Sequence, residues 1–273
     1  MLLPAAESGP GGRPAGRRGW AVRWPDRCDD GFMITAADVD TLLFDVIGTV
    51  VDEGGTMRAE VAAELAAAGL AGPGRAEELA AAWEERSWSL TAELDRGGSW
   101  VSTDEVNARA LAEVLAGAGG GAGGGPAAAL PAEAVRRLGL VGHRLRPWPD
   151  AVAALAALAR RFTVVALSNG NLSMLASVNA RGGLTWHAVL SAELVGARKP
   201  DPAVYRFALD RLALDPGRTL MVAAHPWDLR AAAACGLRTA YIERAGEGRP
   251  EPSDSFDLSC PDLAALAAHL TGG

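Results

Sequence analysis

The chain has 273 residues, of which 49% are hydrophobic and 22% charged, and its formal net charge is -7. These values supply ample apolar side chains for a globular core and more length than one domain of common size needs. The negative charge disfavours a nucleic-acid partner, and no run is long and apolar enough to cross a membrane. Cys28, Cys235 and Cys260 lack metal-ligand spacing and cannot all pair, which favours a reduced, cytoplasmic setting.

A stretch rich in Gly, Pro and Arg precedes the first regular pattern. It has no hydrophobic periodicity, so residues 1–35 are predicted to be a disordered extension. The pair Arg17 and Arg18 is of the kind found in twin-arginine export signals, but no apolar run follows it. Met33 stands just ahead of the first predicted strand, and we hypothesise that it is the true start.

The first predicted strand is the short, mostly apolar run 41–44, which leads into Asp45 and is broken by Gly48 and Thr49. A helical pattern of alanine, leucine and glutamate follows it. Helices are predicted at residues 58–70, 75–95, 103–116 and 131–142, with a flexible glycine-rich loop at 117–126. Residues 56–146 are therefore interpreted as a helical cap inserted into a core formed by residues 36–55 and 147–273. Such a cap would close over Asp45 and exclude water.

Strands and helices alternate in the remaining sequence. Strands are predicted at residues 162–167, 188–191, 219–223 and 239–242. Helices are predicted at residues 150–160, 172–181, 202–212 and 229–235, and Gly236 is well placed to stop the last one. This alternation is typical of the α/β class, with a doubly wound, Rossmann-like parallel sheet covered on both faces.

Polar residues stand at the end of predicted strands or just after them, where an α/β sheet presents its reactive groups. Asp45 follows the first strand, and a carboxylate is a competent nucleophile toward carbon or phosphorus, although it can also cap the turn that follows. Ser168 and Asn169 can hold a substrate anion, although "SNG" is also a good strand exit. Lys199 and Asp228 follow later strands, and a lysine before proline is usually only a surface charge in a turn.

The order of these residues, Asp, Ser, Lys and Asp, resembles the four motifs of the haloacid dehalogenase superfamily, from about residue 40 to residue 244. Magnesium-dependent phosphatases of that superfamily carry acids at two further places, which in this chain hold Ile47 and Ala224. Mg²⁺ requires hard oxygen ligands, whereas a halide leaving group needs neither a metal nor protonation. The chain therefore resembles the type II 2-haloacid dehalogenases, which implies that no cofactor and no metal is used.

The resemblance also implies two groups of site residues. The catalytic group is Asp45 as the nucleophile, supported by Thr49 and Lys199, with Asp228 positioning Lys199 or the hydrolytic water. The substrate-binding group is Ser168 and Asn169 for the substrate carboxylate, with Tyr205, His225, Arg86 and Arg96 nearby. Tyr205 could equally be a core residue on a helix face.

Some of these positions depart from the family pattern. Ile47 stands where many dehalogenases have an aromatic residue, and His225 stands where the best-matched enzymes have Asn. His225 could orient water or take a proton, although a lone histidine is more often a structural hydrogen bonder. The family uses a cap arginine to receive the halide, for which Arg86 and Arg96 are candidates, although both could equally be solvated helix charges.

The predicted activity is hydrolysis of the carbon–halogen bond of a small 2-haloalkanoic acid through an aspartyl ester, giving a 2-hydroxy acid with inverted configuration. Two alternatives stay open: a magnesium-dependent phosphatase acting on a small metabolite, and a degenerate member that binds a ligand without turnover. The expected partner is a small-molecule substrate, and a homodimer stays open.

Overall fold

The structure is a computed structural model that describes residues 34–96, 98, 100–118 and 129–272. Met33 and nearly all of the predicted N-terminal extension lie outside the described residues, and so does most of the predicted glycine-rich loop. None of the described helices is long and apolar enough to cross a membrane.

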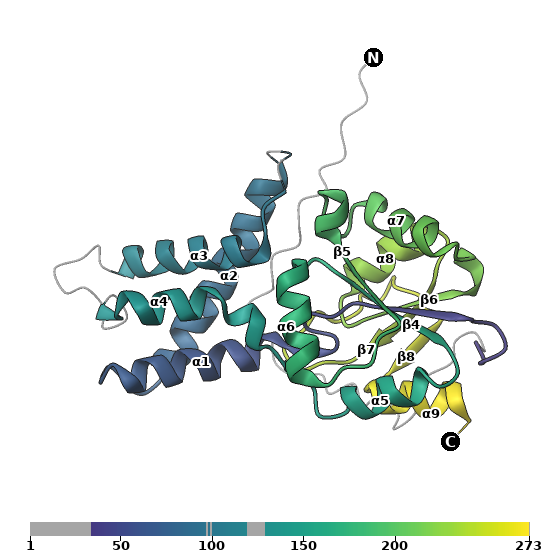
Figure 1. Ribbon diagram of the computed structural model, residues 1–273, viewed down its shortest axis with the longest axis horizontal. Helices are drawn as coiled ribbons and strands as arrows, with labels where there is room; N and C mark the ends of the chain where they lie inside the picture. The colour runs from purple at the N-terminus through teal and green to yellow at the C-terminus, as the bar shows by residue number, and fades with distance from the viewer. Residues whose placement is uncertain (1–33, 97, 99, 119–128, 273) are drawn as a thin grey trace, which may run out of the picture.

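A six-stranded parallel sheet forms the core, in the order β5-β4-β1-β6-β7-β8 (Figure 1). Its strands are β1 (Thr41–Phe44), β4 (Thr163–Ser168), β5 (Ala188–Ser191), β6 (Thr219–Ala223), β7 (Arg238–Ile242) and β8 (Leu258–Cys260). Strand β1 pairs with β4 on one side and β6 on the other. The chain builds outward from β1 to one edge and then returns to its other side, and ligands of such sheets bind at the carboxyl ends of the strands beside this reversal.

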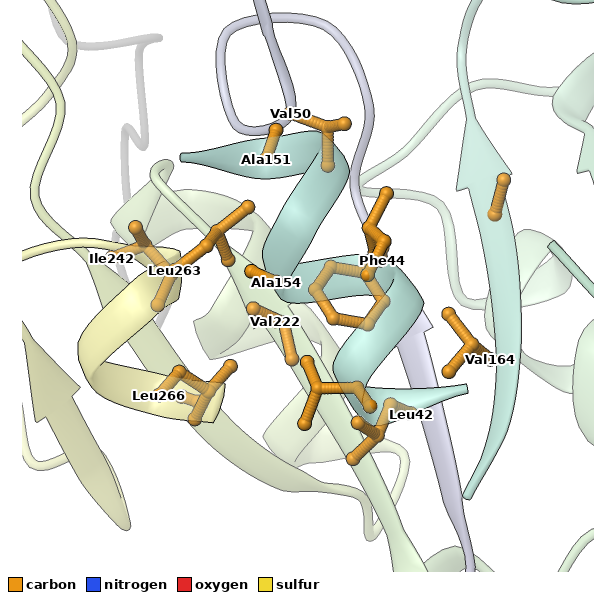
Figure 2. Close-up of a cluster of buried hydrophobic side chains, with 14 of the residues drawn as sticks. Leu42, Phe44, Val50, Ala151, Ala154, Val164, Val222, Ile242, Leu263 and Leu266 are labelled. Carbon is orange, nitrogen blue, oxygen red and sulfur yellow. The ribbon is translucent and has the colours of Figure 1, made fainter. Parts of the chain in front are cut away.

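Helices cover both faces of the sheet, which explains the continuous apolar runs of its strands (Figure 1). One face carries α5 (Ala151–Leu158), α6 (Leu172–Gly182) and α9 (Leu263–Thr271), and the other carries α7 (Pro202–Leu212) and α8 (Pro226–Ala234). Figure 2 shows the packing on the first face, where Phe44 and Val222 from the sheet meet Leu263 and Leu266 from α9. All four of these side chains are fully buried.

Four helices form a region inserted after the first strand and lie beside the sheet (Figure 1). They are α1 (Glu53–Ala67), α2 (Arg75–Arg96), α3 (Thr103–Ala118) and α4 (Ala132–Gly139). They enclose a hydrophobic cluster of their own around Trp83, which is fully buried and donates its indole N–H to the carbonyl oxygen of Asn107 at 2.8 Å. We refer to this inserted region as the cap.

Two short strands carry the chain into and out of the cap. Strand β2 (Val51–Asp52) leads into α1, and β3 (Arg146–Pro147) leads back to the core; the two pair antiparallel. The indole N–H of Trp148 donates to the carbonyl oxygen of Gly48 at 3.0 Å, beside the same crossing. Both connections therefore pass through one small ribbon.

Several helix ends differ from the sequence prediction. Helix α1 begins at Glu53 rather than at residue 58, because Asp52 caps it by accepting a 2.7 Å hydrogen bond from the backbone N–H of Gly55. Helix α8 begins at Pro226 rather than at residue 229, with proline in the first turn, where its missing N–H costs nothing. Helix α4 ends at Gly139, and a 3-10 turn over Val141–Arg144 replaces the rest of the predicted helix. Strands β2, β3 and β8 and helix α9 are not among the predicted elements.

Candidate active site

Loops from three adjacent strands converge at the carboxyl edge of the sheet. Asp45 follows β1, Ser168 ends β4 and is followed by Asn169, and His225 follows β6. Lys199 comes from the loop before α7, and Asp228 lies in the first turn of α8. Segments far apart in the sequence therefore meet around one carboxylate.

The two oxygens of Asp45 are each held by a cationic group. Lys199 donates from Nζ to Oδ1 at 2.7 Å. Oδ2 accepts from the hydroxyl of Thr49 at 2.7 Å and lies 2.9 Å from Nδ1 of His225. Burial alone would raise the pKa of Asp45, but the charges of Lys199 and His225 outweigh it and hold the pKa well below its ordinary value. Asp45 is thus an ionised carboxylate with fixed orientation.

Lys199 bridges two carboxylates in the interior. Its Nζ also donates to Oδ2 of Asp228 at 2.5 Å, and the other oxygen of Asp228 accepts from the hydroxyl of Tyr205 at 2.5 Å. Burial would lower the pKa of Lys199, but Asp228 and Asp45 raise it above its ordinary value. The lysine is therefore charged, and its hydrogen bond to Asp228 helps to fix its position beside Asp45.

Ser168 and Asn169 support this arrangement from β4. Asn169 brackets the backbone of Lys199, accepting from its N–H at 2.8 Å and donating to its carbonyl oxygen at 3.2 Å. Ser168 is fully buried and accepts the backbone N–H of Gly170 at 3.1 Å. Thr103 of the cap donates to the carbonyl oxygen of Asn169 at 3.1 Å, so the cap is tied to this strand end.

A pocket of about 110 Å³ lies over Asp45, between the core and the cap. From the core it is lined by Asp45, Ile47, Asn169, Arg198, His225 and Trp227. From the cap it is lined by Glu53, Met57, Glu84, Ser87, Trp88, Thr91, Thr103, Val106 and Asn107. Since a cavity of about 150 Å³ accommodates benzene, the pocket suits a ligand of only a few heavy atoms.

Two cap carboxyls, Glu53 and Glu84, give the pocket an acidic wall. Burial, followed by the charges of Glu247 and Glu84, raises the pKa of Glu53 from 4.5 to about 8, so this group is mostly protonated at neutral pH. Arg198 lines the same pocket from the core, and its buried guanidinium donates to Asp95 at 3.1 Å and lies 5.6 Å from the ring of Trp100.

The two predicted cap arginines lie elsewhere. Arg86 donates from Nη1 to Glu93 at 2.7 Å and from Nε to Glu113. Arg96 donates to the backbone oxygen of Ala92 in its own helix at 3.0 Å. Neither lines the pocket, and both make contacts of the kind expected for solvated helix charges.

Four ionisable side chains that are not among the predicted site residues stand at the pocket or beside it: Glu53, Glu84, Arg198 and Glu247. Arg198 could have been suspected, because it directly precedes Lys199. Glu53 directly follows the capping residue of α1, and two glycines after it hide the helix start. No local pattern marks Glu247, which reaches His225 from a loop after β7.

The donor set around Asp45 does not suit a divalent cation. The ammonium of Lys199 and the imidazole of His225 already stand at its two oxygens. Ala224 offers only its backbone at the place of the phosphatases' first metal-binding acid, and its N–H donates to the hydroxyl of Thr49 at 2.8 Å. Across the described ranges, no group of three or more His, Cys, Asp or Glu side chains is arranged to hold a metal. Mg²⁺ would need hard oxygen ligands that these residues do not supply.

Comparison with known proteins agrees with this architecture. Residues 39–236 match the haloacid dehalogenase-like hydrolase family. The chain is 32% identical over 219 residues to (S)-2-haloacid dehalogenase 4A of Burkholderia cepacia, covering 76% of this chain and 86% of that protein. It is 37% identical over 137 residues to (S)-2-haloacid dehalogenase 1 of Pseudomonas sp. (strain CBS-3), a match that covers 47% of this chain and 60% of the relative. The crystal structure of the defluorinating L-2-haloacid dehalogenase Rha0230 superposes with a TM-score of 0.75 at 32% identity, covering 85% of this chain and 95% of that one. The chain belongs to the haloacid dehalogenase-like hydrolase family.

Proposed function

We propose that this hydrolase cleaves the carbon–halogen bond of a small 2-haloalkanoic acid, with Asp45 as the nucleophile. The observation that carries the proposal is the setting of Asp45, an ionised carboxylate that lines a small pocket and is fixed by Lys199, Thr49 and His225. A positioned carboxylate attacks a saturated carbon without further activation. The similarity to proteins named (S)-2-haloacid dehalogenases supports the halogenated substrate.

In the proposed cycle Asp45 attacks the halogen-bearing carbon from the face opposite the halogen. The carbon–halogen bond breaks, halide leaves, and an aspartyl ester forms. Water then attacks the carbonyl carbon of that ester, which restores Asp45 and releases the 2-hydroxy acid. Configuration at the substrate carbon inverts once, because the second attack takes place at the carboxyl group of Asp45.

The substrate carboxylate has two groups available in the pocket, the second amide hydrogen of Asn169 and the guanidinium of Arg198. Negative charge on Glu53 and Glu84 would repel the substrate carboxylate. The proposal therefore includes the protonated state of Glu53. With a pKa of about 8, Glu53 is mostly neutral at pH 7, and a neutral carboxyl can donate a hydrogen bond to the substrate rather than repel it.

The phosphatase alternative needs an acid to protonate its leaving group and a cation at Asp45. Ile47 and Ala224 supply neither. Burying the ion pair of Lys199 and Asp228 costs desolvation free energy. A binding protein without turnover would give no reason to keep this costly pair next to Asp45.

Halide release across a panel of 2-chloro- and 2-bromoalkanoates, each enantiomer separately, tests the proposal. Release should be unchanged after complete removal of divalent metal, and activity that a chelator abolishes and Mg²⁺ restores would move the assignment to a phosphatase-type mechanism.

A single turnover in ¹⁸O-water separates covalent catalysis from direct attack by water. The label should enter the peptide containing Asp45 and stay out of the first product. Label found directly in product would mean that Asp45 acts as a general base. Asp45→Asn should release no halide, because a neutral amide is a poor nucleophile.

A further inference from the structure

Besides Lys199 and Asp228, a second line of polar groups starts at Asp45 and consists of His225 and Glu247. Nδ1 of His225 lies 2.9 Å from Oδ2 of Asp45, and Nε2 lies 3.1 Å from Oε2 of Glu247. His225 and Asp45 are buried, and the side chain of Glu247 is 14% exposed. Both nitrogens of one imidazole are therefore engaged by carboxylates.

The fold makes room for this line and fixes its far end. Gly48 has φ +81°, and a Cβ at that position would stand 2.9 Å from Oε1 of Glu247 and 2.9 Å from the ring of His225. The loop that carries Glu247 is anchored by Arg244, whose Nε donates to the carbonyl oxygen of Thr49 at 3.0 Å and whose own carbonyl oxygen accepts from the N–H of Glu247 at 3.2 Å. The loop after β7 thus holds Glu247 against Gly48, in the turn that follows the nucleophile.

Two groups close to Asp45 could take a proton from water, Asp228 and His225, and only one of them lines the pocket. Asp228 is fully buried, is not among the residues that line the pocket, and has both oxygens occupied, by Lys199 and by Tyr205. His225 lines the pocket directly beside Asp45. Water that enters to cleave an ester at Asp45 reaches the imidazole and does not reach Asp228.

We propose that His225, oriented by Glu247, is the general base that takes the proton of the water that cleaves the aspartyl ester. The proposal rests on the proposed function, since it concerns its second step. Asp228 is then a positioning residue for Lys199. The arrangement of nucleophile, imidazole and second carboxylate provides both contact with water and a fixed tautomer.

The charge of Asp45 switches this base on and off. In the free enzyme, burial would lower the pKa of His225, but the hydrogen bonds and charges of Asp45 and Glu247 raise it to about 10, so the imidazole is protonated and donates to both carboxylates. Esterification makes Asp45 neutral, which removes one of the two anions that hold this proton. Of the other groups close by, Glu53 is mostly neutral at pH 7, and the indole of Trp227, with its ring centre 5.3 Å away, does not titrate.

The protons balance over the cycle. After esterification His225 loses a proton to solvent, keeps its Nε2–H on Glu247 and presents the lone pair of Nδ1. Water attacks the carbonyl carbon of Asp45, one of its protons passes to Nδ1, and the bond from the carboxyl carbon to the ester oxygen breaks. The other proton ends on the product hydroxyl. Each turnover thus converts haloacid and water into hydroxy acid, halide and one proton.

Rapid-quench kinetics with a 2-bromoalkanoate test the step. In His225→Gln, which cannot take a proton and does not restore the Asn of related dehalogenases, one equivalent of halide should be released per enzyme at a rate near that of wild type. The following steady state should slow by roughly 100-fold or more. Mass spectrometry should find the alkyl adduct on the peptide containing Asp45. Glu247→Gln should show the same pattern with a smaller effect, and His269→Gln, on α9 far from the pocket, should match wild type.

Loss of the initial halide release in His225→Gln, or an unchanged steady state with no adduct, would overturn the proposal. So would adduct that accumulates in Asp228→Asn but not in His225→Gln. A wild type that releases no halide from any compound overturns the proposed function itself, and this is seen before any variant is compared.

Nitrogen-15 NMR of the imidazole provides a readout that does not depend on turnover. Asp45→Asn imitates the neutral ester, so the pKa of His225 should fall by at least one unit relative to wild type. An unchanged pKa would contradict the switching of the base by Asp45.

Discussion

Replacing Tyr205 with Phe tests the buried cluster behind the nucleophile. The side chain is fully buried, and its hydroxyl donates to Oδ1 of Asp228 at 2.5 Å. Phe has nearly the same shape, so the change removes one hydrogen bond to a charged group and leaves that carboxylate oxygen short of a donor. Such a bond contributes about 1.5–3 kcal/mol to the free energy of unfolding.

Tyr241 offers a matched control, because it is also buried but donates to a neutral acceptor, the carbonyl oxygen of Gly248, at 3.1 Å. Tyr241→Phe should cost about 1 kcal/mol. At roughly 2–4 °C per kcal/mol for a protein of this size, the melting temperature should fall by about 3–12 °C in Tyr205→Phe and about 2–4 °C in the control.

Urea denaturation of the two variants and wild type checks this difference. The midpoints should shift while the slope stays constant, which would show that the native and unfolded states keep their exposed surface areas. If Tyr205→Phe costs no more than Tyr241→Phe, the hydrogen bond to Asp228 is not the charge-assisted contact that the geometry indicates, and the reasoning about this cluster fails.

Four further predictions concern the pocket and the turn that follows the nucleophile. Arg86→Ala and Arg96→Ala should keep wild-type KM and kcat for a 2-haloalkanoate. Arg198→Ala should raise KM by roughly tenfold, because a charged hydrogen bond to the substrate is lost. Equal KM values in all three variants would show that none of these arginines binds the substrate. The KM of wild type should rise above pH 8 as Glu53 ionises, and a Glu53→Gln variant with the same rise would assign it to another group. Because the folded-state pKa of Glu53 lies above its ordinary value, its contribution to stability should decline between about pH 4.5 and pH 8, and pH-dependent melting curves of Glu53→Gln should lack that decline. Gly48→Ala should lower stability by about 1–2 kcal/mol, because Gly48 has a positive φ. It should also lower kcat, since the added methyl group meets the imidazole of His225 and the carboxylate of Glu247. An unchanged kcat would show that these two side chains adjust freely.

The strand-end motifs were predictable because each one combines a local pattern with a general rule. Residues 188–191 and 219–223 are strands and residues 202–212 a helix as predicted, since apolar runs bounded by turns or caps specify these elements locally. The rule that parallel strands present polar groups at their carboxyl ends then brings Asp45 near Lys199, and the structure places their side chains 2.7 Å apart.

The pocket wall was not predictable in the same way. Glu247 and Arg198 belong to loops, and their positions depend on long-range contacts such as those of Arg244 with Thr49 and of Arg198 with Asp95. A single sequence carries no signal for pairs of this kind. Arg86 had the right residue type in the right region, but its place is decided by two neighbouring glutamates on the cap helices.

The β2–β3 ribbon confines both covalent links of the cap to one narrow crossing. Two antiparallel strands side by side have the geometry of a hairpin, so a short turn from Asp52 to Arg146 would close the core without the inserted helices. The cap has a separate hydrophobic cluster around Trp83, and the sheet keeps its own on both faces. The nucleophile with its charged neighbours belongs to one part, and most of the pocket wall belongs to the other. Exchange of caps between such enzymes through this crossing would then change which compound is accepted and leave the chemistry of bond cleavage in place.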